Sequence, residues 1–109
     1  MWQKAHQLTL AVYRLTAGFP KQEMFGLTCQ MQRASVSVAA NIAEGFKRRG
    51  KPDKARLLNI AQGSLEESRY YLILAEDLGY GNTEEQMIVL EETSRFLEAY
   101  IQRILASST

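Results

Sequence analysis

Apolar side chains recur every three or four residues along four stretches of the chain, and this spacing places them on one face of an α-helix. In the third stretch the spacings alternate between three and four residues, the pattern of coiled-coil-like bundle packing. That seam consists of Leu58, Ala61, Leu65, Ser68, Leu72 and Ala75. The face is wide enough to meet two neighbouring helices because of a flanking row, Leu57, Ser64, Tyr71 and Leu78. The predicted helices are residues 2–17, 23–47, 53–78 and 83–106.

Glycine and proline mark the breaks between these helices. Gly18 and Pro20 end the first helix, because glycine tolerates a C-terminal cap conformation and proline disfavours helix at the residue before it. The other two turns are residues 50–53 and 79–82, and both contain glycine.

The fourth helix carries a start signal of its own. Thr83 and Gln86 match a capping box, and Glu84 and Glu85 suit the first turn of a helix electrostatically. Four helices joined by short loops predict an all-α fold, an antiparallel up-down-up-down four-helix bundle that forms a single domain over residues 1–109.

Composition agrees with one globular domain. The 109 residues suffice to bury a core, and 46% hydrophobic with 23% charged residues is ordinary. Cys29 is the only cysteine, which excludes an internal disulfide and a multi-cysteine metal site and favours a reducing cytoplasm. The longest uncharged stretch, residues 34–43, is about half of what a membrane-spanning helix needs. We therefore expect neither a membrane anchor nor a signal peptide.

No pattern in the sequence is typical of an active site. His6 is the sole histidine, and no local signature makes it part of a nucleophilic triad, so we expect a structural or solvated role. Cys29 lies within the second predicted helix, and we expect it to pack as a small hydrophobic side chain. The carboxylates occur mainly as adjacent pairs, which point in different directions on a helix and do not form acid–base dyads. We expect no catalytic residue, metal, cofactor or small-molecule substrate.

Small side chains in the second and third helices indicate close helix packing. Residues 34–40 are small all round, which lets neighbouring backbones approach on more than one face. Gly63 costs about 1 kcal/mol relative to alanine in mid-helix, and close approach of another helix is the natural reason for it. The predicted close-packing positions are Ala34, Ser37 and Gly63.

Asn41, Glu44 and Arg48 follow one another at one-turn spacings, so their polar ends can meet along one helix face. Two interpretations stay open. One is a structural hydrogen-bond network that fixes the register of the helices. The other is a face that contacts a partner.

Charge is divided unevenly along the chain, although the total is only +1. Residues 1–60 hold ten basic and three acidic side chains, whereas residues 61–109 hold three basic and nine acidic ones. This asymmetry can serve an anionic partner, or it can let the two halves attract each other within or between subunits.

The strongest single feature is a basic run at the turn between the second and third helices. Cations there suit the end of one helix dipole but oppose the start of the next, so dipole pairing does not explain the whole run. An anion would explain it, either a phosphate of RNA or DNA or an acidic face of another subunit, and a merely solvated turn is the alternative. With Phe46 as the only nearby aromatic, sequence-specific readout is not expected. The candidate nucleic-acid-binding residues are Lys47, Arg48, Arg49, Lys51, Lys54 and Arg56.

Recognisable motifs are spread over nearly the whole chain, and the sharpest is Asn41-Ile42-Ala43-Glu44-Gly45. The matching stretches are residues 2–5, 19–27, 37–45, 61–67 and 78–80. They resemble a bacterial family of four-helix bundle proteins named from open reading frames in intervening sequences of 23S ribosomal RNA genes. The resemblance implies a ring, commonly a homopentamer, without known catalytic activity. Accessory proteins of diversity-generating retroelements look similar in fold and bind nucleic acid and a reverse transcriptase through basic surfaces.

Two functions remain as hypotheses. The first is a non-enzymatic oligomer that binds RNA or another nucleic acid through the six cations, by phosphate neutralisation with little sequence preference. The second is a structural or adaptor homo-oligomer whose basic turn makes protein contacts. They differ in whether the six side chains remain exposed after assembly.

Overall fold

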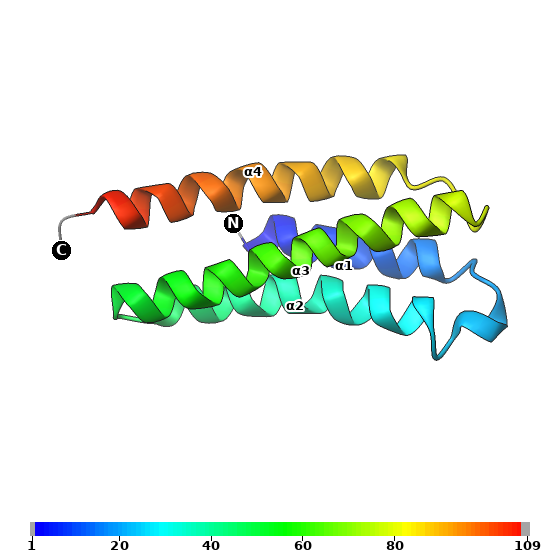
Figure 1. Cartoon of the computed structure of the whole chain (residues 1–109), viewed down its shortest axis with the longest axis horizontal. Helices are drawn as coiled ribbons and strands as arrows, with labels where there is room; N and C mark the ends of the chain where they lie inside the picture. Colours follow the sequence, from blue (N-terminus) through cyan, green and yellow to red (C-terminus); the bar gives the residue numbers. More distant parts are fainter. Residues whose placement is uncertain (1, 108–109) are drawn as a thin grey trace.

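The computed structural model of the chain describes residues 2–107 and consists of four α-helices that run alternately up and down (Figure 1). Each helix packs against the next one along the chain, and the last packs against the first. The whole measures 49 × 23 × 19 Å. The expected all-α antiparallel four-helix bundle is confirmed. Its elements are α1 (Trp2–Thr16), the short 3₁₀ helix η1 (Lys21–Glu23), α2 (Leu27–Lys47), α3 (Lys51–Asp77) and α4 (Glu84–Ala106).

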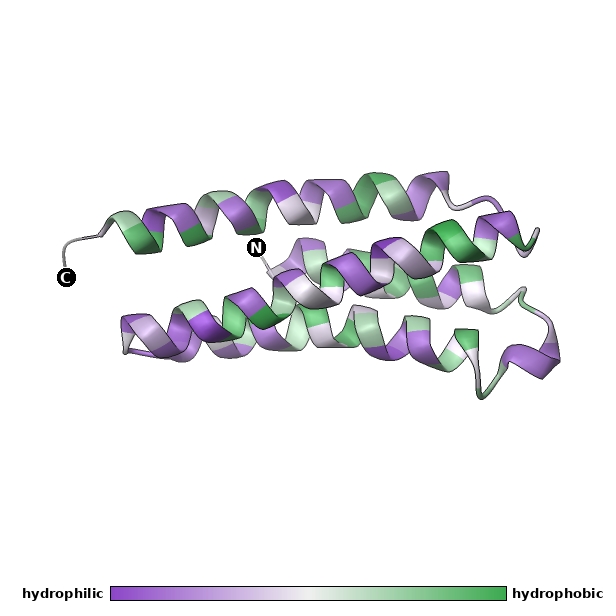
Figure 2. Ribbon diagram, in the orientation of Figure 1, coloured by the Kyte–Doolittle hydropathy of each residue, from purple (hydrophilic) through white to green (hydrophobic). Residues whose placement is uncertain are grey.

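The core runs along the centre of the bundle, and hydrophobic and hydrophilic residues alternate along every ribbon (Figure 2). All six positions of the predicted α3 seam are buried. The same core cluster includes buried residues of the other three helices, among them Leu8 and Val12 of α1, Val38 and Ile42 of α2, and Leu90 and Leu97 of α4. In the flanking row, Leu57 and Ser64 are buried but Leu78 is exposed, because α3 ends at Asp77 and Leu78 lies in the turn.

The second helix begins four residues later than its spacing predicts. Residue 23 belongs to η1, and Gly26 precedes the first residue of α2 with φ −110° and ψ −113°, which is not helical. The Glu23 carboxylate accepts a hydrogen bond from the Leu27 backbone N–H at 3.2 Å. Glu23 therefore caps α2 from outside the helix, where a period-based prediction had counted it as part of the helix.

The predicted capping box at Thr83 is wrong. The Thr83 hydroxyl and backbone N–H both donate to the Glu76 carboxylate, at 3.1 and 3.2 Å. Gln86 is buried and donates to the Ala11 carbonyl at 3.2 Å, so it joins α4 to α1. The start of α4 is instead capped by Asn82, whose side-chain oxygen accepts from the Glu84 N–H at 2.9 Å.

Close helix approach occurs at a glycine that the sequence prediction did not choose. Gly63 is exposed, and a Cβ added there would meet nothing within 4 Å, so its assignment to close packing is wrong within the chain. Gly45 is buried, and a Cβ there would lie 2.9 Å from Leu58 Cδ2. The tight contact between α2 and α3 is therefore at Gly45, in the last turn of α2 and next to the basic turn.

Candidate nucleic-acid interface

The basic run lies at one end of the bundle, where the C-terminal end of α2, the N-terminal end of α3 and the last turns of α4 are near one another (Figure 1). Only residues 48–50 connect α2 to α3, and Pro52 stands in the first turn of α3. Proline suits that position because a backbone N–H in the first turn of a helix has no partner within the helix, so its absence breaks no helical hydrogen bond. The short connection keeps the six predicted cations together, but their side chains divide into two groups.

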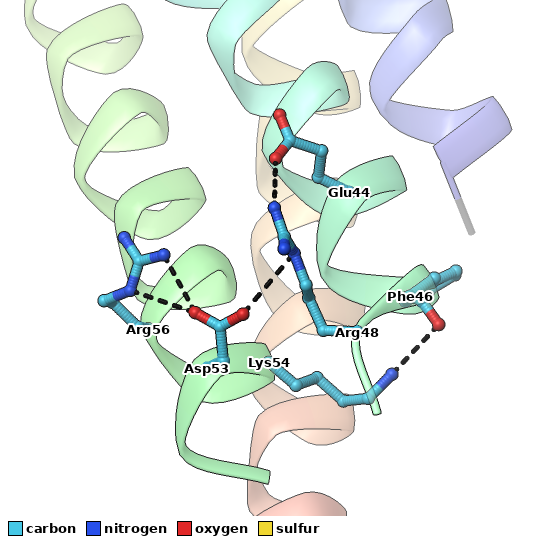
Figure 3. Close-up of polar contacts among 6 residues, drawn as sticks. All are labelled: Glu44, Phe46, Arg48, Asp53, Lys54 and Arg56. Carbon is cyan, nitrogen blue, oxygen red and sulfur yellow. Dashed lines mark hydrogen bonds and ion pairs between the residues drawn. The ribbon is translucent and has the colours of Figure 1, made fainter. Parts of the chain in front are cut away.

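One group forms a chain of ion pairs across the turn (Figure 3). Arg48 Nη2 lies 3.1 Å from Glu44 Oε2, and Arg48 Nε lies 3.5 Å from Asp53 Oδ2. Arg56 binds the other oxygen of Asp53, with Nη2 at 2.9 Å and Nε at 3.3 Å. Asp53 therefore lies between two guanidinium groups. Two cations and two carboxylates cancel, so this group of four side chains carries no net charge.

The other group keeps its charge. Lys54 donates to the Phe46 carbonyl at 3.1 Å, and Lys51 donates to the Ser107 carbonyl. Both carbonyls are neutral acceptors near helix C-termini, so these bonds satisfy carbonyls without a helical partner and leave the two positive charges uncompensated. Among residues 2–107, the side chains of Lys47 and Arg49 have no hydrogen-bond or ion-pair partner.

Three of the uncompensated cations surround a pocket of about 200 Å³. The residues that line it are Arg49, Lys51, Lys54, Tyr100, Ile104 and Ser107. No carboxylate is among these six described residues. Three like charges around one small hollow repel one another, and an anion bound among them would relieve that repulsion.

Aromatic side chains support this pocket from two helices. The rings of Phe46 in α2 and Tyr100 in α4 meet edge to face, with centroids 4.9 Å apart. The Arg103 guanidinium lies 5.6 Å from the Tyr100 ring centroid, and the Lys54 ammonium lies 6.0 Å from that of Phe46. Tyr100 and Arg103 were missed by the sequence prediction, which considered only residues near the turn in the chain.

The polar set predicted on α2 does not form one network. Asn41 donates both of its bonds to Ser37, to the carbonyl at 2.8 Å and the hydroxyl at 3.0 Å, and the Ser64 hydroxyl of α3 donates to Ser37 at 2.8 Å. Asn41 and Ser37 therefore join α2 to α3 beside buried Ala34. Glu44 and Arg48 belong instead to the ion-pair chain at the turn.

A family model described as 23S rRNA-intervening sequence protein matches residues 1–102 of the chain. The chain belongs to this family. The fold of this family member is similar to that of a crystal structure from Bacteroides thetaiotaomicron, which is described as a protein with unknown function from the S23 ribosomal protein family. The two share 23% sequence identity with a TM-score of 0.81, over 93% of this chain and 94% of that chain. No curated protein matches. Neither description names an enzymatic activity.

The opposite end of this 23S rRNA-intervening sequence family member is acidic. Two hollows of about 530 and 720 Å³ lie at the start of α4, and carboxylates such as Glu84 line both. The Tyr80 hydroxyl donates to Glu23 at 2.7 Å. That bond, together with the one from the Leu27 N–H, lowers the pKa of Glu23, while the Glu23 carboxylate raises the pKa of Tyr80.

The reactive side chains of this family member lie apart from the basic end. His6 is exposed and stands edge-on to Trp2, with ring centroids 6.2 Å apart. Cys29 is a free, half-buried thiol in α2. Within residues 2–107, no three His, Cys, Asp or Glu side chains are grouped as metal ligands would be. None of the helices in that range has the length and apolarity to cross a membrane.

Proposed function

We propose that the chain is a non-enzymatic, oligomeric four-helix bundle protein of the cytoplasm that binds RNA or another nucleic acid through the phosphates, at the turn between α2 and α3. One observation carries this proposal. Lys47, Arg49, Lys51 and Lys54 crowd one end of the molecule, and no carboxylate of residues 2–107 neutralises them. Such cations bind phosphate by releasing counterions, which gives affinity with little preference for sequence.

The charges within the turn refine the set of contact residues. Arg48 and Arg56 already hold carboxylates, so a phosphate would have to compete with Glu44 and Asp53 for them. The four other cations have no such competitor in the described part of the chain. We therefore assign the main contacts to these four, with Arg48 and Arg56 in a secondary role.

Oligomer formation, with a homopentamer as the assembly that the family resemblance implies, is supported by large apolar side chains on the surface. Phe25 is 91% exposed, and Met24 beside it is 55% exposed. Surfaces of this kind usually mark contacts with other chains. A mass by light scattering that stays monomeric at high micromolar concentration would end the oligomer proposal.

The same apolar surface favours a second candidate function, a structural or adaptor homo-oligomer that contacts proteins and no nucleic acid. In that case the basic end would meet an acidic face, such as the start of α4 in another subunit. The two candidates make opposite predictions for salt-sensitive RNA binding.

The deciding experiment compares two triple variants over a salt series with unrelated RNA oligonucleotides. Arg49→Gln, Lys51→Gln and Lys54→Gln together should weaken binding at least about 100-fold at low salt, because charge-assisted hydrogen bonds contribute about 1.5–3 kcal/mol each. The slope of log affinity against log salt should flatten by roughly 2, since each phosphate that the variant no longer neutralises accounts for about 0.7.

The matched control, Arg14→Gln, Lys21→Gln and Arg33→Gln, removes the same charge from positions away from this end. It should bind nearly as well as wild type, and circular dichroism should show equal helicity for all three proteins. If wild type shows no salt-sensitive binding to RNA or DNA, the adaptor function replaces the first. Weaker binding in the control alone would move the contact to Arg14, Lys21 and Arg33.

A further inference from the structure

We propose that the pocket beside Tyr100 holds the terminal phosphate, a phosphomonoester, of a nucleic-acid strand. This inference rests on the proposed function and narrows it from phosphates in general to the end of a strand. Three properties of the pocket carry it: its size, its unused donors and a lining of described residues that includes no acid.

The size of the pocket favours a terminal phosphate over an internal one. The pocket of about 200 Å³ is smaller than the roughly 300–1,000 Å³ that ordinary ligand sites offer. An internal phosphodiester has a sugar on each side, so both flanking nucleosides would have to fit at the pocket mouth. A terminal phosphate is attached on one side only and can enter end-on.

Donors around the pocket suit a doubly charged group. Lys51 and Lys54 each use one hydrogen bond of the three that an ammonium can donate, and Arg49 has all five of its N–H groups free among the described residues. The Tyr100 hydroxyl has no hydrogen-bond partner within residues 2–107. A phosphomonoester carries about −1.5 to −2 charge at pH 7 and three acceptor oxygens, whereas a phosphodiester carries a single charge.

Position strengthens the assignment. The ion-pair chain of Glu44, Arg48, Asp53 and Arg56 stays outside the pocket lining, and each of its two carboxylates is already paired with an arginine. Arg103, stacked on Tyr100, adds a fourth cation beside the lining. Arg103 then lies beside the pocket, close enough to contact the adjoining nucleotide of the strand.

The test measures binding of one RNA sequence with a 5′-phosphate, with a 3′-phosphate or with hydroxyls at both ends, by fluorescence anisotropy at constant ionic strength. One phosphorylated form should bind about tenfold more tightly than the hydroxyl form at pH 7.5, as one added charge-assisted hydrogen bond would give. The ratio should shrink below about pH 6, where the monoester loses its second charge.

Two variants test whether the preference for phosphorylated RNA arises at this pocket. In Arg49→Gln the ratio of the affinities for the phosphorylated and hydroxyl forms should fall close to one. In Lys21→Gln, which removes the same charge from η1, the ratio should stay near ten. A nucleoside 5′-monophosphate in about tenfold excess over the oligonucleotide should not displace the phosphorylated strand, because the strand gains further contacts outside the pocket.

Three results would overturn the inference. The first is equal affinity for the hydroxyl form and for RNA with a 5′- or a 3′-phosphate, while salt-sensitive binding persists. That result would leave the proposed function intact. The second is a ratio that survives in Arg49→Gln. The third is full displacement by the mononucleotide, which would assign the pocket to a small free phosphate compound. Absence of binding by any form would instead refute the proposed function together with this inference.

Discussion

The two ends of the bundle are closed by different chemistry. At the basic end, α2 and α3 meet through an apolar contact, Gly45 against buried Leu58, and the charged side chains lie outside it on the surface. At the acidic end, the rings of Phe19 and Tyr80 pack with centroids 5.2 Å apart, and carboxylates themselves tie the loops together. There Glu23 holds Tyr80 and the start of α2.

Because of this difference, the residues that we expect to bind a partner are not the residues that stabilise the fold. Carboxylates at the acidic end are already used as hydrogen-bond acceptors inside the chain. The ion pairs of Arg48 and Arg56 at the basic end contribute little to the fold, because exposed ion pairs stabilise a protein by only about 0–1 kcal/mol. We therefore expect substitutions at the basic end to change binding, and those at the acidic end to change stability and its dependence on pH.

The largest expected effect is on the apolar contact. Leu58→Ala should lower the free energy of unfolding by about 2–5 kcal/mol, because Leu58 is fully buried and its truncation leaves a cavity beside Gly45. Arg56→Gln, which breaks an exposed ion pair above it, should cost less than about 1 kcal/mol. Urea unfolding measures both. Similar costs for the two would mean that surface charges, rather than the apolar contact, hold this end together.

The next effect is a gain in binding. Asp53→Asn removes the carboxylate shared by Arg48 and Arg56, which frees two guanidinium groups for phosphate, and RNA affinity should rise roughly threefold to tenfold. Glu66→Gln is the matched control, because it makes the same charge change by breaking the ion pair with Arg69 in mid-α3. An equal gain in the control would show that net charge alone governs affinity.

A smaller effect distinguishes two glycines of the bundle. Gly45→Ala should destabilise the protein by about 1 kcal/mol, because overpacking against Leu58 outweighs the gain in helix propensity. Gly63→Ala should stabilise it by about 0.5–1 kcal/mol, since the position is open and alanine favours a helix. Thermal unfolding of the two variants gives the comparison. If Gly63→Ala also weakens an oligomer, the open position faces another subunit.

The smallest effect concerns pH at the acidic end. The pKa of Glu23 is lowered from 4.5 on folding, so its contribution to stability is present above pH 4.5 and is lost as pH falls through the folded-state pKa. The pKa of Tyr80 is raised above 10, so its contribution is present below pH 10 and is lost as pH rises. Tyr80→Phe should flatten both limbs of a plot of Tm against pH. Tyr70→Phe, at an exposed position whose hydroxyl bonds to none of residues 2–107, should leave the plot unchanged.

The fold was predictable because it depends on periodicity. The α3 seam is a pattern within one helix, and the spacing alone identified all six of its buried positions. Several errors arose where a residue's partner lies outside its own helical turn. Thr83 and Gln86 resemble a local cap, yet they bond to Glu76 and to Ala11. Gly63 and Gly45 are both helical glycines, and only the packing of α2 on α3 distinguishes them.

The cluster of cations was evident from the sequence, but the way their side chains are arranged on the surface was not. Six cations within ten residues indicated an anion partner, but local sequence does not say which of them the two nearby carboxylates neutralise. Asp53 lies between Arg48 and Arg56 because the turn folds α3 back along α2. Tyr100 reaches the pocket from α4, about fifty residues away in the chain, and the only local signal is its one-turn spacing from Ile104 on the inward face.

The length of the bundle makes our proposal of a polyanionic partner compatible with a net charge of only +1. Ions in solution screen a charge over a Debye length of about 8 Å at physiological ionic strength, far less than the 49 Å that the molecule spans. A strand at the basic end therefore experiences the local cluster of lysine and arginine, and the acidic end exerts almost no repulsion on it. At about 0.01 M salt the Debye length grows to roughly 30 Å, and the carboxylates begin to oppose the approach.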